Sequence, residues 1–114
     1  MESDFTGDKH KPLVGGGVLI EPYKNGKLHG KAISYSTSGS IYSSEQYVDG
    51  KLHGEKITYH LNGKLASISN FANGKQHGIL RVWHSDGIYY YTCTYENGKL
   101  ISQVIVNPRN YWYT

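Results

Sequence analysis

The chain has 114 residues and a formal net charge of +3, which allows one domain and leaves little room for a second. Twelve Lys and Arg stand against nine Asp and Glu without a run of like charges, a balance that argues against nucleic acid as a partner. A single cysteine, Cys93, excludes an internal disulfide and a thiolate-held metal, and it favours a reducing, cytoplasmic location.

The N-terminal part of the chain, residues 1–17, is polar and ends in three glycines. Its first ten residues show neither the apolar core of a secretion signal nor anything near the roughly 20 apolar residues of a membrane span. Because it also lies outside the repeat described next, we predict a flexible segment whose deletion changes stability little.

One motif then recurs at a constant step along the chain: YKNGKLHG at 23–30, YVDGKLHG at 47–54 and FANGKQHG at 71–78. A fourth copy begins at Tyr95 and loses the His-Gly pair after Leu100. Asn-Gly and Asp-Gly accept the positive φ angles of a type I′ hairpin turn. The motif therefore predicts structural turns at Gly26, Gly50, Gly74 and Gly98.

A second glycine turn lies inside each unit, at Gly39, Gly63 and Gly87, so that strands of about 8 to 9 residues remain between turns. We predict an all-β fold: a single elongated, twisted antiparallel meander of about eight strands over residues 18–106, built from repeated hairpins. An aromatic C-terminal tail, 107–114, follows it.

A two-residue turn at Asp49-Gly50 places Tyr47 opposite Leu52, and the same register extended along the strands places Glu45 opposite Gly54 and Ser69 opposite Gly78. Glycine weakens a strand unless a bend or a close approach needs it. We therefore assign the glycines of the His-Gly pairs to curvature and to aromatic rings that cover the backbone.

The repeated unit resembles MORN repeats, and more closely the variant in YwqK-like bacterial antitoxins, over about residues 23–100. The resemblance implies a curved sheet with one hairpin per repeat, used for protein contacts and sometimes proposed for lipid contacts. The motif specifies hairpin geometry, so it implies the fold more firmly than the function.

No catalytic or metal-binding group emerges from the sequence. His29, His53 and His77 occupy equivalent positions about 9.6 Å apart, too far for a shared zinc ion, which favours a structural or solvent-facing role. His84-Ser85-Asp86 holds the residue types of a hydrolase triad, but three consecutive turn residues cannot form a relay. Cys93 reads as a small buried hydrophobe, and Glu45 and Glu55 as surface carboxylates. We predict a non-enzymatic protein without a cofactor.

A one-layer sheet leaves part of its rings exposed, and Tyr and Trp are typical of binding hot spots. We therefore expect a protein partner to bind the face that carries the variable large residues: Tyr35, Tyr42, Tyr59, Ile68, Trp83 and Tyr90, with Trp112 as an extension.

The most specific form of this function is the neutralisation of a partner by an antitoxin or inhibitor, including one encoded by a phage or virus. Two alternatives stay open. The lysine column of Lys27, Lys51, Lys75 and Lys99 fits a peripheral module that binds anionic lipid, and the repeat itself fits a structural or assembly protein. A homodimer through a sheet edge also stays open.

Overall fold

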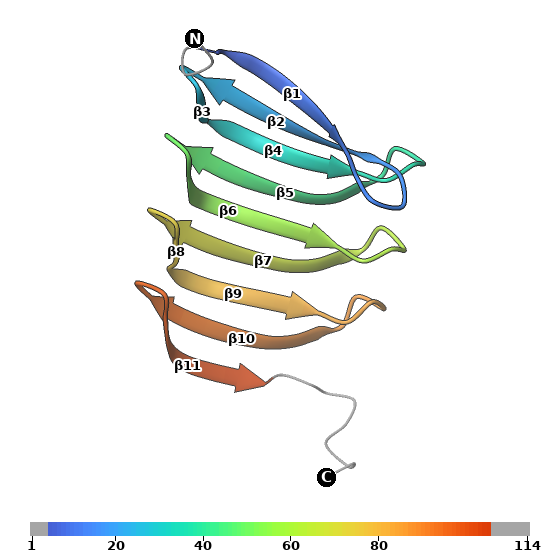
Figure 1. Cartoon of the computed structure of the whole chain (residues 1–114). Coiled ribbons are helices and arrows are strands. Elements are labelled where there is room, and N and C mark those ends of the chain that lie inside the picture. Colours follow the sequence, from blue (N-terminus) through green and yellow to red (C-terminus); the bar gives the residue numbers. More distant parts are fainter. Residues whose placement is uncertain (1–4, 106–114) are drawn as a thin grey trace.

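The computed structural model describes residues 5–105, which form a single antiparallel sheet whose strands are joined by turns (Figure 1). Its neighbouring strands follow the order β1-β2-β4-β5-β6-β7-β9-β10-β11, and the two-residue strands β3 and β8 prolong the hairpins of β2 and β7. The bounds are β1 Gly7–Pro12, β2 Val18–Lys24, β3 Lys27–Leu28, β4 Gly30–Tyr35, β5 Ile41–Val48, β6 Lys51–Tyr59, β7 Leu65–Ala72, β8 Lys75–Gln76, β9 Gly78–Trp83, β10 Tyr89–Glu96 and β11 Lys99–Ile105.

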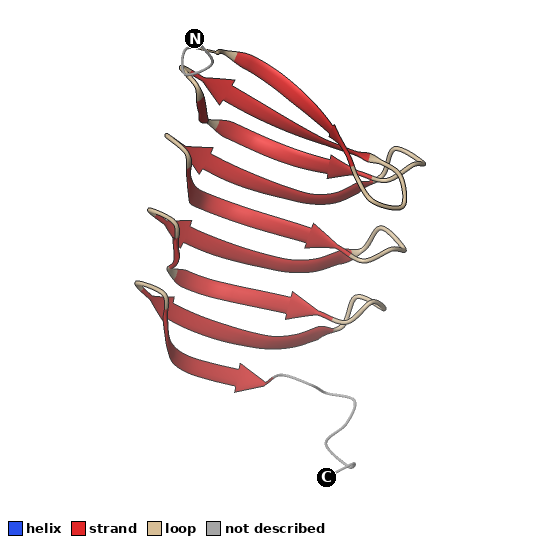
Figure 2. Cartoon of the chain, in the orientation of Figure 1, coloured by secondary structure: helices blue, strands red, loops and turns tan. Residues whose placement is uncertain are grey.

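The predicted all-β meander is confirmed, and eight strands of the path begin at or after Val18, as expected. The described residues extend over 60 × 35 × 17 Å with a radius of gyration of 16.5 Å. A compact domain of similar length has a radius of gyration of about 13 Å. Residues 5–105 therefore form a thin, elongated sheet without a second layer (Figure 2).

Few side chains are fully enclosed, because only one layer exists. Among residues 5–105 the buried side chains are Ala32, Ser44, Ser69 and Cys93. The expectation that Cys93 is a small buried hydrophobe is confirmed at 4 % exposure. Stability must come from cross-strand pairs and half-buried rings, since the described part of the chain has no interior that could enclose large side chains.

The sheet begins before Val18, which corrects the predicted flexible N-terminal segment. Gly7–Pro12 forms β1 and pairs with β2 over six positions, from Gly7 opposite Tyr23 to Pro12 opposite Val18. Polar composition misled the prediction, because an edge strand exposes one long side to water and tolerates Asp, Lys and His there. Residues 1–4 and the tail 107–114 lie outside the described residues.

Two kinds of turn alternate at the two ends of the strands (Figure 2). At the Asn-Gly end, Asn25, Asp49, Asn73 and Asn97 have positive φ angles of 47–52° and the glycine that follows each has 80–85°. Both central residues are left-handed, which defines the type I′ turn that the motif predicts.

At the other end, the turns differ from the Asn-Gly type. Gly63 has a φ of 88°, whereas Asn62 is absent from the positive-φ residues of the described chain. Gly63 N–H donates to His60 C=O at 2.9 Å, and His60 N–H donates to Lys64 C=O at 2.8 Å. These bonds define a three-residue loop in which a type I turn is followed by a left-handed glycine. Equivalent loops close at residues 13–17, 36–40 and 84–88.

The predicted register holds next to the Asn-Gly turns and fails beyond them. Tyr47 lies opposite Leu52 as expected, but a bulge follows, so that Glu45 lies opposite Lys56 instead of Gly54. Gly54 instead lies opposite Phe71 on β7. The prediction assumed an unbroken ladder, whereas Gly54, at a φ of 110°, lies in the bulged part of β6.

The prediction that these glycines make room for covering aromatic rings therefore needs correction. An aromatic residue does lie opposite each of them, Tyr47 opposite Gly30 and Tyr95 opposite Gly78. However, the atom nearest to a Cβ built on Gly54 is Gln46 Oε1, at 2.7 Å. The positive φ and the bulge, more than a covering ring, require glycine here.

Candidate binding surface

Strand pairing sets the two faces of the sheet, because directly opposed residues in an antiparallel ladder share a face. One row runs across the strands through Ile20, Ile33, Ser44, Ile57, Ile68, Arg81 and Thr92. Tyr35, Tyr59 and Trp83 lie two residues along from members of this row and thus on the same face. We call this surface the tyrosine face, with the members Ile33, Tyr35, Ile57, Tyr59, Ile68 and Trp83.

The tyrosine face unites four of the seven residues predicted to bind a partner: Tyr35, Tyr59, Ile68 and Trp83. All four are partly exposed. Tyr42 and Tyr90 lie at equivalent bulge positions, where Tyr35 pairs with Ile41 and Trp83 with Tyr89. Trp112 lies outside the described residues.

Aromatic side chains gather at the β9–β10 hairpin. The Trp83 and Tyr89 rings lie 5.5 Å apart between centroids, and the His84 and Tyr90 rings stack at 4.2 Å. Tyr90 also meets the edge of Tyr91 at 5.1 Å. These spacings lie in or near the range of favourable ring pairs, so the rings hold one another in place as well as offering contact area.

Hydrogen bonds join this hairpin to the repeat before it. His60 Nε2 lies 2.9 Å from Trp83 C=O, Asn62 Nδ2 donates to Ser85 C=O at 2.6 Å, and Lys64 Nζ donates to Asp86 C=O at 3.2 Å. Since these bonds reach main-chain oxygens, they persist when the side chains of the later hairpin are replaced.

The opposite surface, which we call the glycine face, carries Tyr23, Tyr47, Phe71 and Tyr95 opposite the glycines of β1, β4, β6 and β9. These rings recur at one position per repeat, as expected of residues that the hairpin itself requires. The tyrosine face also carries one ring per repeat, and there the ring changes from Tyr35 and Tyr59 to the larger Trp83.

Charged groups on the glycine face are paired within the chain. Lys11 Nζ lies 2.8 Å from Glu21 Oε1, and Lys56 Nζ lies 3.4 Å from Glu45 Oε2. The hydrogen bond to Glu21, and then the charge of that carboxylate, raises the pKa of Lys11. Lys9 Nζ lies 4.6 Å from the centroid of the Tyr23 ring, within cation–π range.

Burial raises the pKa of the Tyr47 phenol, and the negative charges of Glu45 and then Glu21 add to the effect. The phenol is therefore held in its neutral form on this face. Internal pairing leaves these groups less available to a partner than the rings of the tyrosine face.

A hydrogen-bond ladder along the Asn-Gly turns was missed by sequence reasoning. Gly50, Gly74 and Gly98 each donate their N–H to a carbonyl of the preceding repeat, at 2.7–2.8 Å; the acceptors are Leu28, Leu52 and Gln76. His29, His53 and His77 accept, at Nδ1, the N–H of the residue just before each of these glycines, at 3.2–3.4 Å. Of the two roles that were predicted, structural or solvent-facing, the histidines have the structural one, because each accepts a hydrogen bond from the next repeat.

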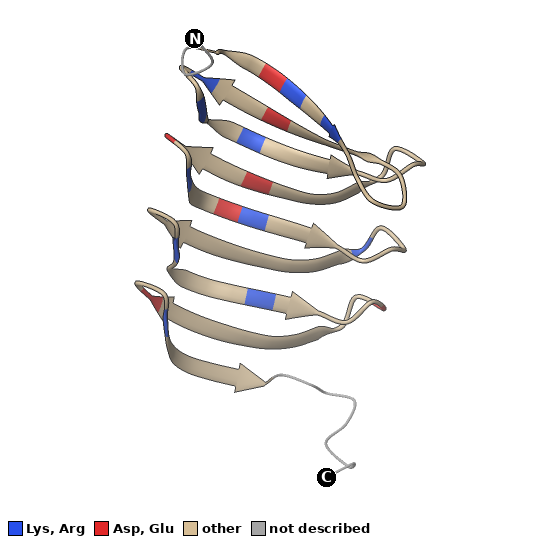
Figure 3. Cartoon of the chain, viewed as in Figure 1, with Lys and Arg blue, Asp and Glu red and all other residues tan. Residues whose placement is uncertain are grey.

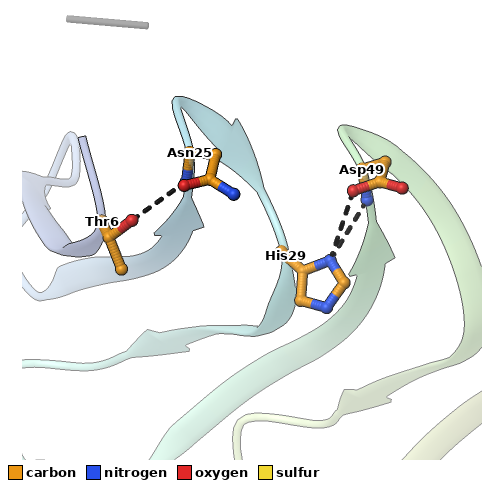
Figure 4. A network of polar contacts seen from close by, with 4 residues as sticks. All are labelled: Thr6, Asn25, His29 and Asp49. Carbon is orange, nitrogen blue, oxygen red and sulfur yellow. Dashed lines mark hydrogen bonds and ion pairs between the residues drawn. The ribbon is translucent and has the colours of Figure 1, made fainter. Parts of the chain in front are cut away.

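Acceptance of an N–H requires an unprotonated Nδ1. His29 differs from the other two because Nδ1 also lies 3.7 Å from Asp49 Oδ1, where a protonated ring would form an ion pair (Figure 4). His53 and His77 face Asn73 and Asn97 instead of an aspartate, and all three histidines accept a main-chain N–H at Nδ1.

The N-terminal segment forms the same pair of hydrogen bonds with other residues. Gly26 N–H donates to Phe5 C=O at 2.7 Å, and Asn25 N–H donates to Thr6 Oγ1 at 3.0 Å (Figure 4). Phe5, Thr6 and Gly7 thus stand where later repeats have Leu or Gln, His and Gly. The sequence signal was the pair Thr6-Gly7, which precedes His29-Gly30 by a step just one position shorter than the regular repeat.

The structure describes no group that suggests bound metal. In residues 5–105 no three side chains of His, Cys, Asp or Glu come together in a way that would hold an ion. No helix within that range is long and apolar enough to cross a membrane.

Fold and surface together define a single-layer β-repeat protein that offers an extended aromatic face. The family model described as the MORN repeat variant matches residues 28–49, 52–73 and 76–97, more than half of the chain. The chain belongs to this family. Each matched unit begins at the residues that accept the ladder bonds and ends at the first residue of the turn that donates them, just before the donor glycine. No curated protein matches the chain in a sequence comparison.

Proposed function

We propose that this chain is a protein-binding repeat module and that its partner docks on the tyrosine face. A single observation carries the proposal: Tyr35, Tyr59 and Trp83 form one partly exposed row, with Ile33, Ile57 and Ile68 beside it, on a sheet that has no second layer. Such rings combine large contact area with few rotatable bonds and a polar tip, as binding hot spots do.

The change from Tyr to the larger Trp at the end of this row supports the choice of face. A repeat scaffold acquires a specific binding surface where equivalent positions differ between repeats. The row ends on Trp83, whose ring neighbour Tyr89 holds it at the edge of the aromatic cluster. Trp83 is thus the residue for which we expect the greatest effect on binding.

The most specific form of this function is neutralisation of the partner, as an antitoxin or inhibitor. It is supported by the resemblance of the repeated unit to YwqK-like antitoxins and by the contact area that the tyrosine face offers to a protein. A partner recovered in a one-to-one complex, whose activity falls on addition of the chain, would support this form. A bound partner with unchanged activity would favour a scaffolding role.

The test is co-purification from the source cell, identification of the partner by mass spectrometry, and titration of that partner by calorimetry. Trp83→Ala should raise the dissociation constant about 30-fold, which corresponds to the roughly 2 kcal/mol of a hot-spot residue. Tyr95→Ala on the glycine face is the matched control, and it should leave the affinity within about threefold. Thermal melts of both variants separate loss of binding from loss of fold.

Two outcomes would contradict the proposal. Equal loss of binding and of fold in Trp83→Ala would make the ring part of the scaffold, and full retention of both would place the interface elsewhere.

An anionic-lipid surface is the second candidate, because Lys27, Lys51, Lys75 and Lys99 are all exposed at the Asn-Gly end of the sheet (Figure 3). Asp49 and Glu96 lie among them and weaken the positive field. Co-sedimentation with phosphatidylserine vesicles tests it. Tight binding that Lys51→Gln and Lys75→Gln abolish, together with the absence of a protein partner, would favour the lipid.

A further inference from the structure

We infer that a second copy of this chain adds to the sheet at β11, so that two β11 strands pair antiparallel about a two-fold axis near Gln103. The strand is the terminal one in the path, and among the described residues only β10 pairs with it. Its outer side therefore presents main-chain N–H and C=O groups without a strand to pair with there, as any edge strand does. This inference goes beyond the proposed function, because it concerns the edge of the sheet and not its face.

The apolar side chains of β11 distinguish this edge. All seven of its residues are exposed, and they include Leu100 at 48 %, Ile101 at 54 %, Val104 at 57 % and Ile105 at 66 %. A long, apolar and accessible edge strand is a site at which another strand pairs unless a protein blocks it. The described residues of β11 contain no proline and no acidic residue, and Lys99 at its start is the one charge.

The opposite edge is blocked in the way that edge strands usually are. β1 carries Asp8, Lys9 and Lys11 and ends on Pro12, which has no N–H to donate (Figure 3). Head-to-tail pairing of β11 with β1 of another copy would place lysines beside isoleucines and would generate an open filament. Pairing of β11 with itself closes after two copies.

The faces of the sheet restrict the register of this pairing. Opposed residues must share a face, so the axis passes through a residue and not between two residues. Ser102 and Val104 pair with Thr94 and Thr92 of β10, whereas Gln103 pairs with Cys93 between them. An axis at Gln103 places Val104 opposite Ser102 of the second copy, and it brings Ile105 next to Ile101, the bulge residue that has no partner on β10. It also gives the greatest overlap of the apolar residues 101–105.

Charge is compatible with this arrangement. Lys99 lies four positions before Gln103, so the two copies of Lys99 would lie about 27 Å apart along the strand direction. That distance exceeds the screening length of about 8 Å at physiological ionic strength. The axis is perpendicular to the sheet, so both tyrosine faces point to the same side and form one continuous surface.

The fourth repeat supports a terminal role for this strand. Ile101 stands where His29, His53 and His77 stand in the earlier repeats, and it has no ring nitrogen to accept an N–H from a following turn. Ser102 replaces the glycine, and the bulge that follows Leu100 shifts the register by one residue instead of two. β11 thus lacks the groups that would bind another repeat through the same hydrogen bonds. Its own apolar edge stays free to pair.

The test is sedimentation equilibrium of the full chain, with Val104→Lys as the variant and His10→Lys as its control. Both replace an exposed side chain by lysine on the tyrosine face, at opposite ends of the same cross-strand row. We expect a dimer whose dissociation constant rises about tenfold or more in Val104→Lys and stays unchanged in His10→Lys. Far-UV circular dichroism checks that both variants keep the sheet.

Amide hydrogen exchange of the wild-type chain tests the strand without any substitution. Half of the β11 amides bond to β10, and in the dimer the remaining amides from Ile101 to Ile105 should become protected as the concentration rises. A monomer at every concentration would overturn the inference. A dimer that resists Val104→Lys, or one that His10→Lys dissociates, would place the contact at another surface and would equally overturn it.

Discussion

Replacement of Gly54 tests the physical reason for the His-Gly step. Gly54 has a φ of 110°, and a Cβ at this position would lie 2.7 Å from Gln46 Oε1 and 3.3 Å from Gln46 Cδ. Gly63 has a φ of 88° in a loop where a Cβ would meet nothing within 4 Å. A side chain in the left-handed region costs about 1–3 kcal/mol, so Gly63→Ala measures backbone strain alone.

Gly54→Ala should cost that strain and, in addition, the displacement of the Gln46 side chain, which we expect to contribute about 0.5–1 kcal/mol. Gly54→Val should cost more again, because its branched Cβ cannot avoid the same neighbour. Urea and thermal denaturation measure these differences, since a change of about 1 kcal/mol shifts the melting temperature of a domain of this size by about 4 °C.

A double-mutant cycle identifies the neighbour. Gln46→Ala should reduce the cost of Gly54→Ala, whereas Phe71→Leu should leave it unchanged. The reverse result would restore ring cover as the reason for the glycine. A Gly54→Val protein that melts at the wild-type temperature would refute both explanations.

Three further predictions concern the N-terminal strand, the ladder and the glycine face. Deletion of residues 1–17 removes β1 and the acceptors Phe5 C=O and Thr6 Oγ1. It should therefore lower the free energy of unfolding by more than about 2 kcal/mol. An unchanged urea midpoint would show that β1 contributes little. His53→Ala removes the Nδ1 that accepts Asn73 N–H. Because water can replace this acceptor at an exposed turn, the free energy of unfolding should fall by only about 0.5–1 kcal/mol. The control His10→Ala should leave it unchanged. Tyr47 has a raised pKa in the folded chain, so its contribution is complete below about pH 10 and is lost as the pH rises through the folded pKa. The stability of wild type should therefore fall relative to Tyr47→Phe in alkaline urea titrations, and parallel curves for the two proteins would contradict the shift.

The sequence by itself determined the class of fold and the Asn-Gly turns. A type I′ turn is a local structure, decided by the two residues that adopt positive φ, so Asn25-Gly26 and its three repeats predict it without knowledge of the rest of the chain. The constant step between these turns then implies stacked hairpins, because equal units bury their surfaces only against one another. The parity that places Tyr35, Tyr59 and Trp83 on one face is also local, since it follows from the alternation of side chains along each strand.

Only the tertiary structure decided the register beyond each turn and the role of the N-terminal segment. Both depend on contacts between strands that are distant in sequence: the bulge at Gly54 aligns β6 with β7, and the pairing of Gly7 with Tyr23 recruits a polar segment into the sheet. The ladder from His53 to Asn73 was equally hidden, because its partners belong to successive repeats. Main-chain N–H and C=O groups are present in nearly every residue, so a sequence does not specify which of them meet until the strands are paired.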